Sequence, residues 1–157
     1  MVNSVQLELI KPSDRSLYLP YLLLADESEK IVKQYMNAGD MYSICYGINI
    51  AGVVLFTFHS KQVVELKNIA LDTAYRSKGI GKLVLNEACE NYRRKGLHKM
   101  IVGTANSSIG NLAFYQKAGF RMAEIKRDFF KDYPEPIFED GIRALDMVMF
   151  EKELINY

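Results

Sequence analysis

A glycine-rich turn with cationic side chains is the segment of this sequence best suited to bind an anion. It spans residues 76–82, R-S-K-G-I-G-K, and leads into a stretch whose apolar residues recur at helical spacing. The start of a helix leaves backbone N–H groups unpaired, its dipole favours negative charge, and glycine lets a large anion approach closely. We therefore expect a phosphate or pyrophosphate here. The alternative is that Gly79 and Gly81 only make a tight turn.

The spacing of the glycines narrows the class of phosphate ligand. A Walker loop requires G-x-x-x-x-G-K-[ST], which is absent. A dinucleotide fingerprint requires G-x-G-x-x-G after the first strand, whereas here Val84 stands at the third glycine position, midway along the chain. ATP and NAD are therefore poor candidates for the ligand. A generic phosphate- or nucleotide-binding protein is one alternative function.

A second motif follows in the order expected for one enzyme family. Residues 108–120, S-I-G-N-L-A-F-Y-Q-K-A-G-F, resemble the N-x-x-A-x-x-x-Y-x-K-x-G-F helix of the GNAT acetyltransferase superfamily, and R-x-x-G-x-G at 76–81 resembles its acyl-CoA signature. Ser108 stands where the family often has Asn, and Asn111 where it often has Ala. The resemblance covers about residues 5–152. It implies the GNAT fold and transfer of an acetyl group from acetyl-CoA to an amine.

The resemblance also implies the residues that hold coenzyme A. Backbone amides of the glycine-rich turn bind the pyrophosphate, and main-chain groups of the preceding strand bind the pantetheine arm in a gap between two splayed parallel strands. The implied cofactor-binding residues are Ile69, Ala70, Leu71, Arg76, Ser77, Lys78, Gly79, Ile80, Gly81, Lys82 and Asn111.

Two further residues match catalytic positions of the family. Amine attack on a thioester needs a neutral nucleophile, and a lysine-like amine with a pKa of ~10.4 must lose a proton at a cost of roughly 4 to 5 kcal/mol. Glu65 lies at the position where the histone-acetylating branch carries its glutamate base, so Glu65, or a water that it holds, is the expected base. The alternative is an exposed strand glutamate. Tyr115 matches the position of the family's general acid. The alternative is that Tyr115 only packs on Leu112 and Phe120.

The remaining reactive side chains are assigned no role. Cys45 and Cys89 are too few for a disulfide scaffold or a cysteine-built zinc site. Cys89 falls on the apolar side of a predicted helix, which favours an inert thiol and direct amine attack over a ping-pong route. His59 and His98 stand alone and are expected to be solvated, so no metal site is predicted.

The loop from Asp128 to Arg143 is the expected determinant of the acceptor. Carboxylates and aromatic rings together suit a cationic amine or guanidino compound. An aromatic-anchored loop or an oligomer contact is the alternative. The residues concerned are Asp132, Glu135, Glu139, Asp140, Phe129, Phe130, Tyr133 and Phe138. The acceptor is expected to be a small-molecule or peptide amine, and a non-catalytic acyl-CoA sensor is the alternative function.

The elements that must position these residues follow from hydrophobic periodicity. We expect a single mixed α/β domain over residues 1–157, with about seven strands and about four helices. Asn49-Ile50 is the expected hairpin turn, and an irregular alternation near Asn68 indicates a bulge. Strands are predicted over 5–10, 41–48, 51–58, 62–71, 98–105, 120–128 and 143–152, and helices over 17–25, 31–36, 79–94 and 108–118.

Composition excludes several broad classes. Twenty Lys and Arg against 19 Asp and Glu give a formal charge of +1, without the basic excess of a nucleic-acid binder. The longest apolar run, residues 18–25, is too short to span a bilayer, and residues 1–12 do not read as a signal peptide. We expect a cytoplasmic protein with no nucleic-acid or membrane partner, and the family resemblance makes a homodimer plausible.

Overall fold

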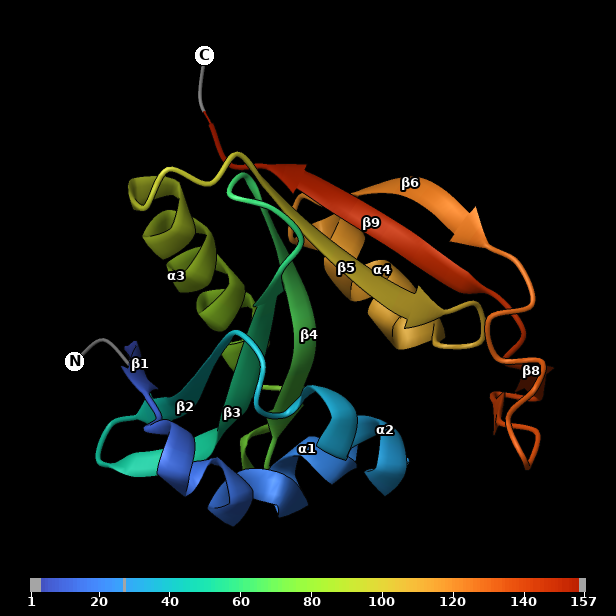
Figure 1. The fold of residues 1–157 in the computed structure, drawn as a ribbon, viewed down its shortest axis with the longest axis horizontal. Coiled ribbons are helices and arrows are strands. Elements are labelled where there is room, and N and C mark those ends of the chain that lie inside the picture. The colour runs from blue at the N-terminus through green and yellow to red at the C-terminus, as the bar shows by residue number, and fades with distance from the viewer. Residues whose placement is uncertain (1–3, 27, 156–157) are drawn as a thin grey trace.

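In the computed structural model, which describes residues 4–26 and 28–155, the core of the protein is a mixed sheet (Figure 1). Its seven strands lie in the order β1-β2-β3-β4-β5-β9-β6. Only the β4–β5 pair is parallel. The strands of this sheet are β1 Val5–Leu9, β2 Asp40–Tyr46, β3 Asn49–Phe58, β4 Val63–Leu71, β5 Lys99–Ala105, β6 Arg121–Lys126 and β9 Met147–Glu153.

Four α-helices and a small hairpin complete the described part of the chain. The helices are α1 Leu19–Ala25, α2 Glu29–Tyr35, α3 Ile80–Arg94 and α4 Ile109–Lys117. Two 3-10 helices span Pro12–Tyr18 and Thr73–Tyr75, and the two-stranded sheet pairs β7 Phe138–Glu139 with β8 Ile142–Arg143. The predicted α/β fold, with about seven strands and four helices, is confirmed. No helix in the described residues is both long and apolar enough to cross a membrane.

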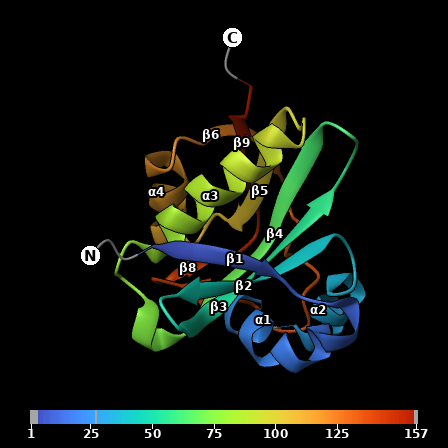
Figure 2. The same ribbon diagram turned by 90° about the vertical axis from the view of Figure 1, so that its left-hand side faces the viewer.

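The helices cover both faces of the sheet (Figure 2). Because strand side chains alternate between faces, Val54 and Phe56 of β3 pack in one core cluster with α3 and α4. Val53 and Leu55 pack in a second cluster with α1 and α2. Residues 51–56 of β3 are thus buried on both faces of the sheet.

The predicted bulge near Asn68 is present in β4. Leu55 of β3 pairs with Asn68, whereas the next residue, Phe56, pairs with Leu66, so Lys67 is the extra residue. An extra residue shifts the alternation of side chains between faces. Leu66 therefore packs in the α3 cluster, while Ala70 packs in the α1–α2 cluster.

Beyond the bulge, β4 and β5 separate. Their parallel pairing joins Val63–Leu66 to Lys99–Val102 and goes no further. The two strands diverge beyond this point (Figure 1). The edge of β4 from Lys67 to Leu71 that faces β5 thus has no strand partner, as the expected gap requires.

Several predicted boundaries differ from the structure, and two of these differences have an identifiable cause. The β2–β3 turn lies at Gly47-Ile48 rather than at Asn49-Ile50, because Gly47 supplies the positive φ of +64° that the turn needs. The last strand begins at Met147 rather than at Arg143.

A side chain explains the late start of β9. Asn106 Oδ1 accepts from the backbone N–H groups of Leu145 and Asp146, at 2.9 and 3.0 Å. These groups are therefore not available to a strand partner, and Arg143 instead pairs with Phe138 in the β7–β8 hairpin.

Candidate active site

The turn between β4 and α3 presents unpaired backbone amides. Ser77 and Gly79 both have positive φ, at 61° and 76°. The first main-chain bond of the helix runs from Leu83 N–H to Gly79 O at 3.3 Å. Within the described residues, no backbone N–H group of residues 77–82 donates to a main-chain carbonyl. Consecutive amides left free at a helix start form an anion-binding concavity.

A cavity of about 830 Å³ opens onto these amides. Its lining carries the cationic side chains of Arg76, Lys82 and Lys117 against the single carboxylate of Glu139, a formal charge of +2. Lys78 does not line it, and its ammonium lies 6.0 Å from the centre of the Tyr75 ring. The charge and the free amides suit a multiply phosphorylated ligand.

The two glycines of the turn serve different needs. Gly79 has open space around a hypothetical Cβ, so its positive φ is what favours glycine there. At Gly81 a Cβ would lie 3.1 Å from the Phe114 ring of α4. Gly81 therefore lets α3 and α4 approach each other, and it also lines the cavity.

The other implied cofactor-binding residues line the same cavity. Ile69, Ala70 and Leu71 come from the unpaired edge of β4, and Asn111 comes from α4. The Leu71 carbonyl accepts from Arg76 Nε at 3.0 Å, and Asn111 Nδ2 donates to Thr104 Oγ1 at 3.3 Å. All the implied cofactor-binding residues except Lys78 thus meet at one cavity.

A second cavity of about 870 Å³ adjoins the first. Ile69, Ser108, Asn111 and Glu139 belong to the lining of both. The side chains that line the second cavity carry a formal charge of −2, with His59 counted as neutral. Its charged side chains are Asp26, Glu65, Glu135 and Glu139 against Lys67 and Lys126. A cationic molecule is favoured here.

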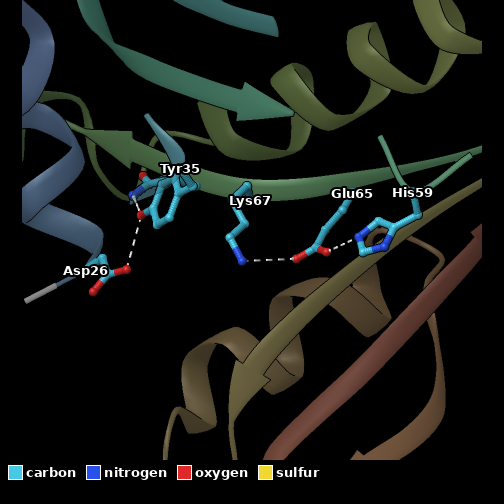
Figure 3. Close-up of polar contacts among 6 residues, drawn as sticks. Asp26, Tyr35, His59, Glu65 and Lys67 are labelled. Atoms are coloured by element: carbon cyan, nitrogen blue, oxygen red, sulfur yellow. Dashed lines mark hydrogen bonds and ion pairs between the residues drawn. The ribbon is translucent and has the colours of Figure 1, made fainter. Parts of the chain in front are cut away.

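Glu65 lies in the second cavity and is held by two neighbours (Figure 3). Its Oε1 is 2.5 Å from His59 Nε2, and its Oε2 is 3.9 Å from Lys67 Nζ. The Glu65 side chain is 14 % exposed, and that of His59 53 %. His59 is exposed to solvent, as expected, and the β3–β4 turn also brings its ring onto Glu65.

Tyr115 reaches the same cavity from α4. Its ring packs between Phe120 and Phe150, with centroids 5.9 and 5.8 Å away. Desolvation by burial raises the pKa of the Tyr115 phenol to about 12. The residue is thus both a core tyrosine and a neutral, protonated group at a cavity wall.

The loop between β6 and β9 closes the second cavity. Phe129, Phe130, Tyr133, Glu135 and Glu139 line it, whereas the other predicted acceptor residues, Asp132, Phe138 and Asp140, do not. The Glu139 carboxylate accepts from both Ser107 Oγ and Ser108 Oγ, at 3.1 and 2.8 Å. Ser108 therefore ties this loop to α4 instead of capping the helix with its side chain.

Sequence reasoning missed a polar group beneath α1 and α2. Asn68 Nδ2 donates to the Leu22 carbonyl at 3.1 Å and to the Tyr35 hydroxyl at 2.9 Å. The Tyr35 hydroxyl in turn donates to Asp26 Oδ2 at 3.1 Å. The polar Asn68 among apolar neighbours was the available signal, but its partners are 33 and 46 residues away along the chain.

The remaining reactive side chains lie outside both cavities. Neither Cys45, Cys89 nor His98 lines either one. Burial raises the pKa of the Cys89 thiol, with a smaller opposing effect of Lys152. Within the described part of the chain, no group of three or more His, Cys, Asp or Glu side chains is placed to hold a metal ion.

Known proteins are similar to this chain in sequence and in fold. A model of the "Acetyltransferase (GNAT) family" matches residues 10–120. The "Uncharacterized N-acetyltransferase YvbK" of Bacillus subtilis is 39% identical over 154 residues, 98% of this chain and 99% of that protein.

Two solved structures are similar throughout. A GNAT family acetyltransferase from Elizabethkingia anophelis with acetyl-CoA bound is 34% identical, with a TM-score of 0.85, over 97% of this chain and 99% of that one. A Bacillus subtilis acetyltransferase in complex with CoA is 37% identical, with a TM-score of 0.86, over 98% and 100%. The sequence match and the shared fold show that this chain belongs to the GNAT family of acetyltransferases.

Proposed function

We propose that the protein is an N-acetyltransferase that moves the acetyl group of acetyl-CoA to a primary amine by direct attack in a ternary complex. The observation that carries this proposal is the connection between two cavities of opposite charge. Free amides at residues 77–82 open onto the basic cavity, and the acidic cavity beside it holds Glu65 and Tyr115. The two linings meet at the unpaired edge of β4.

The basic cavity suits coenzyme A. The free amides, Arg76 and Lys82 would bind the pyrophosphate. Ile69, Ala70 and Leu71 would offer main-chain groups to the pantetheine arm along the β4 edge that lacks a strand partner. Acetyl-CoA supplies the acetyl group as a thioester. The similar proteins with acetyl-CoA or CoA bound support this assignment.

Glu65 is the proposed base. Transfer forms a bond between the amine nitrogen and the acetyl carbon, breaks the carbon–sulfur bond, and removes one proton from the amine. Glu65, or a water that it holds, takes that proton. His59 and Lys67 hold the Glu65 carboxylate toward the cavity. The His59 ring itself is exposed to solvent.

Tyr115 is the proposed acid. The departing sulfur needs a proton, and a phenol with a pKa of about 12 is protonated at neutral pH. Its position between aromatic rings fixes where the proton is delivered. Direct attack is favoured over a covalent acetyl-enzyme because neither cysteine lines the cavities.

The test combines binding with turnover. Thermal shifts with acetyl-CoA, ATP and NAD report the ligand class, and release of free coenzyme A thiol across a panel of primary amines reports transfer. We expect a stabilisation of several degrees with acetyl-CoA alone, and thiol release that depends on the amine. Stabilisation without turnover on any amine would favour the acyl-CoA sensor, and equal shifts with ATP would contradict the donor.

A further inference from the structure

We propose that Asp26, Tyr35, Phe130 and Tyr133 form a subsite for a second cationic group of the acceptor, so that the preferred acceptors are diamines. This inference rests on the proposed function and names its substrate class. All four residues line the acidic cavity. They come from three separate elements, the end of α1, the end of α2 and the loop after β6, which meet only in the folded chain.

The Asp26 carboxylate supplies the negative charge. Its Oδ1 accepts from Ser28 N–H at 3.1 Å and its Oδ2 from the Tyr35 hydroxyl at 3.1 Å. These neutral donors fix its position without cancelling its charge. No Lys, Arg or His of the described residues forms an ion pair with it. An ammonium group of a ligand would supply the missing counter-charge.

Aromatic side chains line the same cavity as this carboxylate. Phe130 and Tyr133 pack edge to face with centroids 5.3 Å apart, and Phe130 N–H donates to the Leu145 carbonyl at 2.9 Å. Burial first, and then the nearby Asp26 carboxylate, raise the pKa of the Tyr133 phenol. Tyr133 and Asp26 both line this cavity. Aromatic faces beside a carboxylate are a favourable site for an ammonium group.

Lys67 and Lys126 are the two lysines of the cavity lining that would oppose a cationic ligand, and the surroundings of Lys67 limit its effect. Its ammonium lies 3.9 Å from Glu65 Oε2 and 5.3 Å from the centre of the Tyr35 ring. Lys67 is thus already paired with a carboxylate, and one Tyr35 face already accepts a cation. Figure 3 shows the resulting row along β4, with Asp26 and Tyr35 at one end, Lys67 in the middle, and Glu65 and His59 at the other end.

The row gives each end of a diamine a role. One amine would lie beside Glu65, which takes its proton, and the other would remain charged beside Asp26. A monoamine fills only the first position. An aminocarboxylate would place a negative charge next to Asp26, where it is repelled.

Three probes of similar length separate these cases: 1,5-diaminopentane, its uncharged-end isostere hexylamine, and 5-aminopentanoate. With saturating acetyl-CoA we expect kcat/KM for the diamine to exceed that for either other probe by about tenfold. Equal values for the diamine and hexylamine, or a preference for 5-aminopentanoate, would overturn the subsite.

Variants test the residues. Asp26→Asn should lower the ratio of diamine to hexylamine kcat/KM about fivefold, mainly through KM of the diamine. Tyr133→Leu should lower the ratio similarly, and Tyr133→Phe should preserve it because the ring remains. Asp132→Asn is the control, since it removes one carboxylate charge from the loop that carries Tyr133, at a position outside the cavity. An unchanged ratio in Asp26→Asn would contradict the inference.

Calorimetric binding of 1,5-diaminopentane to the protein saturated with coenzyme A separates this inference from the proposed function. Binding that weakens in Asp26→Asn, without acetylation of any probe, would support the subsite and overturn the transferase. Acetylation of all three probes with equal efficiency in the wild type and in Asp26→Asn would support the transferase and overturn the subsite. No binding and no acetylation of any probe would overturn both. Thermal unfolding of each variant with coenzyme A checks that it folds.

Discussion

The Glu65 carboxylate has one neighbour from its own strand and one from the preceding turn. Lys67 follows Glu65 by two residues in β4, and residues at this spacing in a strand point to the same face. His59 lies at the β3–β4 turn, which brings its ring within 2.5 Å of Glu65 Oε1. The surroundings of the proposed base therefore depend on the conformation of this turn.

Replacing Glu65 tests the base. Glu65→Gln keeps the shape but removes the proton acceptor, so we expect kcat to fall about 100-fold. The Kd for acetyl-CoA should stay within about twofold, because Glu65 does not line the basic cavity. Steady-state kinetics and calorimetry measure both. Wild-type kcat in Glu65→Gln would exclude the carboxylate as base.

His59→Gln changes only how Glu65 is positioned, so kcat should fall less than in Glu65→Gln. Glutamine still donates a hydrogen bond to Glu65 but is shorter and more flexible than imidazole, so a loss of kcat of only several-fold is expected. His98→Gln is the control because His98 lines neither cavity. A loss in His59→Gln as large as in Glu65→Gln would make His59 itself the proton acceptor.

Tyr115→Phe removes the proposed acid and leaves the aromatic packing in place. Since its ring contacts Phe120 and Phe150, the variant should fold and bind acetyl-CoA nearly as well as the wild type. We expect kcat to fall about 100-fold. Thiol-release kinetics check this, and unchanged turnover would leave Tyr115 with a packing role only.

At the scale of elements, the β4–α3 turn depends on backbone conformation. Gly79→Ala places a Cβ at a φ of +76° without any steric contact. The strain of about 1–2 kcal/mol should favour a different turn and weaken acetyl-CoA binding about tenfold.

Gly47→Ala is the matched control. Gly47 also has a positive φ, +64°, and open space, but it lies at the β2–β3 turn outside both cavities. It should lose similar stability while binding acetyl-CoA normally. Equal weakening in both variants would show that Gly79 acts only through global stability. Calorimetric titration and urea unfolding measure the two quantities.

The sequence predicts elements well where periodicity and turn residues agree. The turn glycines Gly39, Gly96 and Gly119 all have positive φ where helix ends were expected. The irregular alternation near Asn68 also predicted the bulge correctly.

Features made by side chains distant along the chain were not predictable. Asn106 delays β9 by binding amides 39 and 40 residues away, and Glu139 ties its loop to Ser108 across 31 residues. No local pattern marks such contacts. For the same reason, the sequence singled out Glu65 and Tyr115 through motif positions but missed His59, Asp26 and Tyr35.

For the molecule as a whole, the near-neutral net charge conceals two oppositely charged cavities. The formal charge of the chain is +1, whereas the linings of the cavities carry +2 and −2. This arrangement fits the proposed binding of an anionic donor and a cationic acceptor at separate cavities, and salt should weaken both.

Buried tyrosines also give the whole molecule a pH dependence. Burial is the main cause of the raised pKa of Tyr35, Tyr92 and Tyr115. Above pH 10 the unfolded chain loses these phenolic protons, while the folded chain keeps them. The free energy of unfolding should therefore fall as pH rises from 10 toward about 12, the value for Tyr115.

Urea unfolding between pH 8 and 11 measures this effect. For each buried tyrosine the loss should approach about 1.4 kcal/mol per pH unit above 10. Tyr115→Phe should reduce the slope. Stability that is flat across this range would contradict the burial of the three phenols.

The central claim is that free main-chain amides at residues 77–82 bind the pyrophosphate of coenzyme A. Titration of the isotopically labelled protein with coenzyme A, followed by amide NMR, tests it most directly. The largest shifts should fall on residues 77–82, with smaller ones on Ile69 and Leu71. Unshifted amides at 77–82 at saturating coenzyme A would contradict the account.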